Sequence, residues 1–175
     1  MMLLPVSVDD RTLLGFANTA GSLIVCFYAD SVTCFSAEWA FHSEKQLWNV
    51  CYTEQEWKEA PLSKPSFENN TDSLKRVLLD LKDLAQKTDC DTFADVFQKA
   101  YDTLMGEPEC AAGVSKIVPP GIPEEHQRVF AAMGSWNDSP PYLAREKGRE
   151  EEYEALSDAL LREIRTATMY ATNQW

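Results

Sequence analysis

The hydrophobic pattern changes its period near the middle of the chain, and this change limits the folds that the chain can adopt. Before position 53, short runs of aromatic and β-branched residues alternate with polar breaks, which is typical of strands. After position 71, apolar side chains recur every three to four positions, which is typical of amphipathic helices. A chain of 175 residues suits one domain. We therefore predict a single α+β domain over residues 1–175, with an N-terminal antiparallel sheet packed against helices of the C-terminal half.

Three to four strands are expected in residues 1–53, and a connection follows in residues 54–70. The candidate strands are Thr12–Ala17, Ser22–Ala29, Val32–Phe41 and Leu47–Tyr52. The breaks between them are short, which favours antiparallel neighbours, and the Asp30-Ser31 pair predicts a tight hairpin. Alternation along the third run predicts a sheet with one buried face and one mixed face.

About four helices are expected in residues 71–175. The most regular apolar stripe begins at Leu74 and predicts a helix over Asp72–Lys87, with Asn70 or Thr71 as its cap. The other expected helices are one from an N-cap at Asp91 to just before Gly106, a short one from Pro123 to Gly134, and a long one from about Gly148. A Pro-Pro pair is expected to break the chain before the last helix.

The chain is strongly acidic, with 28 acidic and 16 basic side chains and a formal net charge of −12. Residues 1–70, 71–110 and 111–175 carry about −5, −4 and −3, so the acidity is spread along the chain. This charge repels phosphate backbones and anionic bilayers, so neither nucleic acid nor a membrane is an expected partner. Two interpretations stay open, namely plain solubility and electrostatic steering toward a basic partner protein.

The cysteines and the apolar stretches indicate a cytosolic protein. Five cysteines form an odd set without short pair spacings, which is typical of reduced thiols. The longest apolar stretch, Leu23–Ala29, is too short to cross a bilayer or to form the core of a signal peptide. The cytosol is therefore the expected compartment.

No motif for a metal, a cofactor or a catalytic site is evident. His42 and His126 lack a cysteine or a second histidine at ligand spacing, so no metal site is expected. A nucleophile elbow, a phosphate-binding loop and a dinucleotide turn are missing from the sequence, and no cofactor is expected. One alternative stays open, a small cytosolic enzyme with a thiol or carboxylate in a sheet-helix cleft, which would combine Cys26 or Cys34 with His42 and Asp138.

The segment 130–142 is the most distinctive part of the sequence. Trp136 stands next to Asn137 and Asp138, between an apolar run and two prolines. In one interpretation Trp136 is an exposed anchor for a partner, and the polar neighbours accept hydrogen bonds from that partner. In the other, Trp136 fills the core and its neighbours bond to nearby backbone amides.

Met133-Gly-Ser-Trp-Asn-Asp138, followed by a glutamate-rich helix through Tyr153 and Leu156, resembles the C-terminal portion of small bacterial immunity proteins of polymorphic toxin systems. The resemblance covers about the last 50 residues. The resemblance implies tight binding to a cognate toxin domain, whose active site is masked without any chemical step. We expect the protein to be a monomer or a weak dimer. A scaffold or dimerising protein without a toxin partner remains a further alternative. The contact candidates are Trp136, Asp138, Glu150, Glu151 and Glu152.

Overall fold

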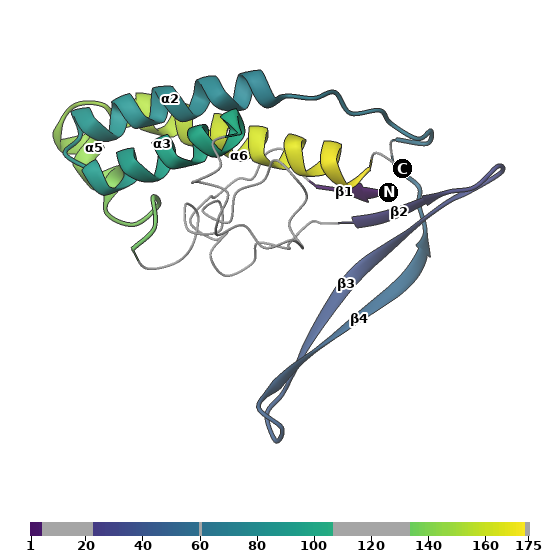
Figure 1. Cartoon of the computed structure of the whole chain (residues 1–175). Helices are drawn as coiled ribbons and strands as arrows, with labels where there is room; N and C mark the ends of the chain where they lie inside the picture. The colour runs from purple at the N-terminus through teal and green to yellow at the C-terminus, as the bar shows by residue number, and fades with distance from the viewer. Residues whose placement is uncertain (5–22, 60, 107–133, 174–175) are drawn as a thin grey trace.

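The computed structural model of the chain describes residues 1–4, 23–59, 61–106 and 134–173. Within these ranges, a four-stranded antiparallel sheet from the N-terminal part precedes four helices, which confirms the predicted α+β class. The helices lie together, and two of the strands extend away from them (Figure 1). The molecule therefore has a helical body and a projecting β-structure.

The sheet follows chain order, β1-β2-β3-β4, and every neighbouring pair is antiparallel. Its strands are β1 (Met2–Leu3), β2 (Leu23–Phe27), β3 (Val32–His42) and β4 (Leu47–Glu56). Three of the predicted strands are confirmed, and the one predicted over Thr12–Ala17 lies outside the described residues. The turn between β2 and β3 is closed by a hydrogen bond from Tyr28 N to Ser31 O (2.9 Å), so its centre is Ala29-Asp30, one position before the predicted pair.

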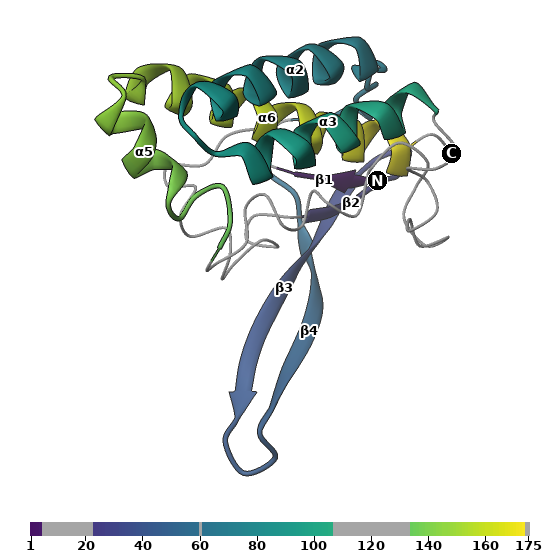
Figure 2. The same ribbon diagram turned by 60° about the vertical axis from the view of Figure 1, so that its left-hand side comes forward.

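β3 and β4 form a hairpin that is longer than the rest of the sheet. They pair from Thr33 with Glu56 to His42 with Leu47, whereas β2 reaches only as far as Ser36 on β3. Beyond Ser36 the described sheet consists of two strands, and this ribbon projects away from the helices (Figures 1 and 2). The expectation of one buried face is wrong for this part, because no described element covers either face and every residue from 38 to 56 is exposed.

β4 continues to Glu56, four residues beyond the predicted end of that strand at Tyr52. Its polar last residues keep partners on β3, since the hydroxyl of Thr33 donates a hydrogen bond to Glu54 Oε1 (2.7 Å). The backbone N–H of Trp57 then donates to the carbonyl of Val32 (3.0 Å). The connection between the sheet and the helices is therefore shorter than the predicted range of 54–70.

The four described helices are α2 (Thr71–Lys87), α3 (Asp91–Met105), α5 (Pro140–Glu146) and α6 (Glu150–Thr172). Three of them were predicted, and the helix expected from Pro123 lies outside the described residues. α5 was not predicted, because the Pro140-Pro141 pair was interpreted as a break. Both prolines lie in the first turn of α5, where the missing backbone N–H groups have no intrahelical partner to lose.

The expected helix caps are partly corrected. Asn70 is at the N-cap of α2, but its side-chain amide donates to the backbone carbonyl of Glu163 (2.8 Å) and so ties α2 to α6. Cys90 occupies the N-cap of α3, and Asp91 lies in the first turn. Gly106 ends α3 in the left-handed conformation (φ 83°), which matches its expected role as a C-terminal stop.

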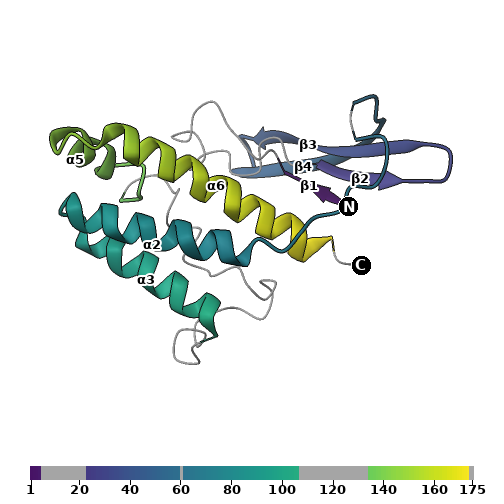
Figure 3. The same ribbon diagram turned by 90° about the horizontal axis from the view of Figure 1, so that it is seen from above.

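The helices form their own hydrophobic core. The leucine stripe of α2 belongs to one buried cluster with side chains of α3, α5 and α6. α2 lies against both α3 and α6, and α5 lies beside the beginning of α6 (Figure 3). The largest fully buried side chains of this core are Trp136, Tyr153, Phe97, Leu74, Leu78, Leu81, Leu84 and Leu160. Residues of the sheet are absent from this cluster of described residues, so the helical body packs largely on itself.

The sheet meets the helical body at the C-terminal end of α6, where both ends of the chain lie close together (Figure 1). Asn173 donates to the carbonyl of Met2 (2.7 Å) and accepts a hydrogen bond from its N–H (2.8 Å). The N–H of Leu4 points at the sulfur of Met169 (3.3 Å). Among the described helices, none is both long and apolar enough to span a bilayer.

Candidate functional site

The outer part of the β3–β4 hairpin, residues 37–52, carries a one-sided set of apolar side chains. We call these residues the arm. Side chains alternate between the two faces of a strand, and directly paired residues share a face. The register therefore gathers on one face, which we call the aromatic face, Ala37, Trp39, Phe41, Trp48, Val50 and Tyr52. The opposite face carries mainly polar or small residues, namely Glu38, Ala40, His42, Leu47, Asn49 and Cys51.

Three aromatic side chains of the arm contact one another, and they belong to no described core. The rings of Trp39 and Trp48 meet edge to face at 6.4 Å, and those of Phe41 and Trp48 lie 5.2 Å apart. Trp48 remains 60% exposed, Tyr52 57% and Trp39 52%. The arm thus has the apolar side of a sheet, and no second layer from the described part of the chain covers it.

The exposed area of the aromatic face is comparable to that of known interaction patches. An aromatic side chain carries about 150–250 Å² of surface, so four that are half exposed leave on the order of 400 Å² of apolar surface. The largest apolar patch on a typical monomer is roughly 300–600 Å² and is often functional. Since the described residues contain no element that covers it, this face is the strongest candidate for a binding surface.

Charges on the hairpin are mainly acidic and lie around the aromatic face. Glu54 and Glu56 share this face at the base of the hairpin, and Glu44 lies next to Lys45 in the turn at its tip. Lys58 forms an exposed ion pair with Glu56 at 3.3 Å. The surroundings of the aromatic face therefore match the acidity of the whole chain, which has a net charge of −12.

The structure places Trp136 in the helical core, which corrects the expectation that it is an exposed anchor. Its side chain is fully buried, and its Nε1–H donates to the hydroxyl of Ser157 at 2.8 Å. Its ring contacts those of Phe93, Phe97 and Tyr153 at 5.0–5.3 Å. A ring enclosed in this way cannot contact a partner in the folded protein, so its contacts favour the structural interpretation.

Asp138 stabilises the turn that precedes α5. Asp138 is exposed, and its Oδ2 accepts a hydrogen bond from the backbone N–H of Gly134 at 2.9 Å. Gly134 has φ 76°, a conformation that favours glycine. The hydroxyl of Tyr153 donates to the carbonyl of Trp136 at 2.8 Å. The described part of the Met-Gly-Ser-Trp-Asn-Asp segment therefore connects α5 and α6 to the core.

The first turn of α6 contains the three predicted acidic contacts, Glu150, Glu151 and Glu152. This turn lies beside α5, at a distance from the arm (Figure 1). Arg145 donates to Glu150 at 2.7 Å, and Arg149 donates to Glu152 at 2.7 Å. The hydrogen bond that Arg145 donates to Glu150, together with the negative charge of Glu150, raises the pKa of Arg145. Neighbouring cations thus offset much of the charge of this turn, which is not a purely anionic patch.

The parts of the alternative catalytic site are not brought together. Cys34 is at the base of the hairpin and His42 is at its tip, eight positions along β3, which corresponds to roughly 25 Å in a strand. Asp138 precedes α5 in the helical body. A thiol-imidazole-carboxylate site of these residues would need a short distance between them, so the structure does not support that combination.

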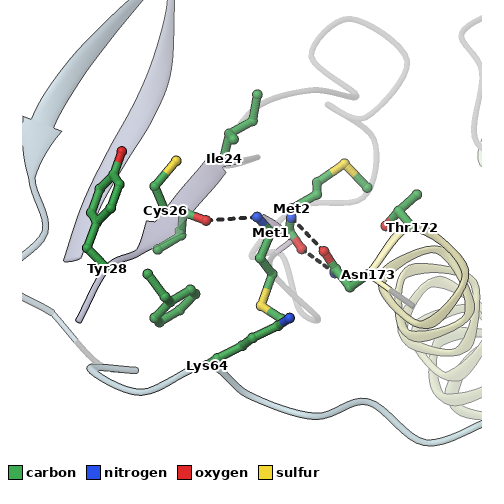
Figure 4. A pocket seen from close by; sticks show the side chains of 10 residues that line it. Met1, Met2, Ile24, Cys26, Tyr28, Lys64, Thr172 and Asn173 are labelled. Carbon is green, nitrogen blue, oxygen red and sulfur yellow. Dashed lines mark hydrogen bonds between the residues drawn. The ribbon is translucent and has the colours of Figure 1, made fainter. Parts of the chain in front are cut away.

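An open hollow of about 560 Å³ lies between β2 and the C-terminal end of α6 (Figure 4). Cys26 and Lys64 are among the residues that line it, together with the side chain of Asn173. Its described lining contains neither a histidine nor an acidic side chain, and the described residues hold no cluster of three potential metal ligands. Among the described lining residues, the hollow thus holds one thiol, that of Cys26, without the imidazole or the carboxylate of the proposed combination.

Comparisons of the chain with protein-family models, with curated proteins and with solved structures found no match. The functional argument therefore rests on the residues themselves. The aromatic face was missed in the sequence, although its alternation was visible from Ala37 to Tyr52. That alternation indicates which residues share a face, but whether another layer covers the face depends on how the hairpin lies relative to the helical body (Figure 1).

Proposed function

We propose that the chain is an immunity protein that binds a cognate, basic toxin domain in the cytosol and blocks its active site. The exposed aromatic face of the arm is the observation that carries this proposal. Trp and Tyr are frequent among the few interface residues that supply most of the binding energy. The aromatic face places two tryptophans and a tyrosine, each more than half exposed, on one surface.

The shape of the arm supports inhibition by steric occlusion. The paired segment from Ala37 to His42 spans roughly 20 Å at about 3.4 Å per residue, and it projects from the body (Figure 2). Active sites are usually concave. A narrow projection of this length fits into a cleft and excludes substrate from it without any chemical step.

The net charge supports a basic partner. Toxins that cleave nucleic acids need positive charge to hold the phosphate backbone. A protein with a net charge of −12 is attracted to such a surface over long range, which accelerates association at low salt. Of the contact candidates in the sequence, the exposed acidic residues Asp138, Glu150 and Glu151 contribute to this long-range attraction. Trp136 is excluded by its burial.

The proposal is tested by measuring binding to the product of the neighbouring gene. Wild-type protein is compared with the double variant Trp39→Ala/Trp48→Ala and with Tyr142→Ala, which removes an aromatic side chain that is 65% exposed on α5. Loss of two anchors is expected to weaken binding by at least about 30-fold, equivalent to 2 kcal/mol. Tyr142→Ala is expected to bind as tightly as the wild type.

The salt dependence and the inhibition complete the test. We expect the association rate to fall with rising salt, while the dissociation rate changes little. The toxin domain is expected to lose its activity in the presence of one equivalent of the wild-type protein and to keep it with the arm variant. Absence of binding by the wild type, or equal binding by the arm variant, would contradict the proposal.

A further inference from the structure

The hydrogen-bond pattern of the hairpin shows which backbone groups of β4 face outward. In an antiparallel pair, residues alternate between those bonded to the neighbouring strand and those whose N–H and C=O point away from it. Trp57 N donates to Val32 O (3.0 Å), which fixes the phase of this alternation. Counting back along the register, the backbone groups of Trp48, Val50 and Tyr52 point away from β3.

β4 is the last strand of the described sheet, so these groups form an open edge. All ten of its residues are exposed, and those from Leu47 to Thr53 carry no charge and include no proline. Proteins usually protect such an edge with lysine, proline, a bulge or a covering segment. Val50, Trp48 and Tyr52 also belong to the aromatic face, so one strand presents both an open edge and apolar side chains.

We propose that the edge of β4 receives an extended segment of the toxin domain, which pairs with it as a fifth strand. This inference rests on the proposed function and specifies its binding mode. Directly opposite side chains of paired strands contact each other. The incoming strand therefore carries apolar side chains opposite Trp48, Val50 and Tyr52, and basic side chains opposite Glu54 and Glu56 at the base of the hairpin.

A second copy of the chain fits this edge less well. Two β4 strands that pair antiparallel about Val50 align only the uncharged residues from Leu47 to Thr53, so no opposite charges attract across this pair. Each copy also carries a net charge of −12, which opposes self-association. The charge pattern of the edge therefore favours a basic segment from another protein.

Proline and alanine at the same position separate the backbone contribution from that of the side chain. Val50→Ala removes the side chain and keeps the outward N–H, whereas Val50→Pro removes both and is compatible with an edge strand. We expect Val50→Pro to weaken binding of the neighbouring gene's product about tenfold more than Val50→Ala, because a hydrogen bond and the fit of the strand are lost. Phe41→Pro and Phe41→Ala form the matched pair at the opposite edge and are expected to differ little.

Hydrogen exchange on the wild-type complex gives an independent test that requires no variant. In the free protein, the inward amides of Asn49 and Cys51 are bonded to β3, and the outward amides of Val50 and Tyr52 are open to water. We expect the hydrogen-exchange rates of the outward amides to fall at least about tenfold on binding. Wild-type binding without this protection, and equal effects of Val50→Pro and Val50→Ala, would overturn the fifth strand but not the proposed function.

Two further outcomes are separated by the same experiments. If the wild type binds no product of the neighbouring gene, the proposed function itself fails. If gel filtration shows a dimer of the isolated protein, and its outward amides on β4 are already protected, the edge is occupied by a second copy and the inference is overturned. A monomer with open outward amides that become protected only in the complex supports the inference.

Discussion

Trp136 in the helical body and Trp48 in the arm are the same residue type in opposite situations. Trp136 is fully buried among other aromatic rings, and its N–H donates to Ser157 Oγ at 2.8 Å. Trp48 is 60% exposed, and its ring contacts belong to side chains that are themselves about half exposed. The helical body thus uses its tryptophan for folding, whereas the arm presents its tryptophans to the outside.

The difference in burial between the two tryptophans shows which part of the molecule can still gain free energy by covering apolar surface. Fully burying a large apolar side chain stabilises a protein by roughly 1.5–3 kcal/mol. In the helical body this stabilisation is realised on folding, because α2, α3, α5 and α6 enclose the core. In the arm most of it is realised only when another surface covers the aromatic face.

The largest expected effect is the difference in stability between variants that truncate one or the other tryptophan. Trp136→Ala is expected to lower the free energy of unfolding by about 3–5 kcal/mol, because it leaves a cavity in the core. Trp48→Ala is expected to lower it by about 1 kcal/mol or less, since only contacts between exposed rings are lost. Denaturant titrations of both variants measure the difference. Equal destabilisation by the two changes would mean that the arm is part of the folding core, and the comparison would fail.

A smaller effect is expected from the hydrogen bond of Trp136. Ser157→Ala leaves the indole N–H without its acceptor in a fully buried position. We expect a loss of about 1–3 kcal/mol of stability, the usual cost of a buried polar group left unsatisfied. Ser43→Ala in the exposed turn of the hairpin is the control and is expected to be close to neutral. A neutral Ser157→Ala would show that the core accommodates the unpaired group.

The arm is expected to respond locally to a change that relieves backbone strain. Gln46 has φ 51° in the turn of the hairpin, and a residue with a Cβ pays about 1–2 kcal/mol for the left-handed conformation. Gln46→Gly removes this cost. It also removes the exposed hydrogen bond that the side chain of Gln46 donates to the carbonyl of Ser43, which offsets part of the gain. We expect slower exchange of the inward amides near the tip and an unchanged midpoint of global unfolding. A raised midpoint would show that the arm and the helical body unfold together.

The helices were largely predictable from the sequence, because their burial follows from local periodicity. The stripe at Leu74, Leu78 and Leu81 identifies a face, and neighbouring helices with similar stripes cover it. The arm shows the limit of this approach, since the same alternation fits a covered or an uncovered face. Which of these applies depends on the direction in which the hairpin leaves the helical body, and no local pattern near Trp48 contains that information.

The predicted site residues illustrate the same limit. Trp136 and Asp138 were singled out because an aromatic residue next to polar residues is typical of both an interface and a capped turn. Tyr153 and Ser157, which decide between these alternatives, come from α6, about 20 residues further along the chain. A sequence pattern identified the segment, but long-range packing determined its role.

The smallest expected effect concerns an ion pair between Lys147, after α5, and Asp89, in the turn between α2 and α3. The hydrogen bond to Asp89 and its charge, with a contribution from Glu146, raise the pKa of Lys147 above its ordinary value of 10.5. A pKa raised by folding means that the stabilisation is complete below the unfolded pKa and is lost as pH rises through the folded pKa. Lys147→Met is therefore expected to be slightly less stable than the wild type at neutral pH, and this difference disappears in strongly alkaline solution.

Both side chains of this pair are largely exposed, so salt should reduce the same difference at neutral pH. Denaturant titrations at low and high salt, below and above the ordinary pKa of lysine, measure both dependences. If the difference persists in alkaline solution, it comes from the packing of the lysine stem and not from its charge. Lys147 would then stabilise the protein by apolar packing, as the buried side chains of the helical body do. Arg165, whose pKa is lowered by burial, would be the next residue of this body at which to test for an effect of charge on stability.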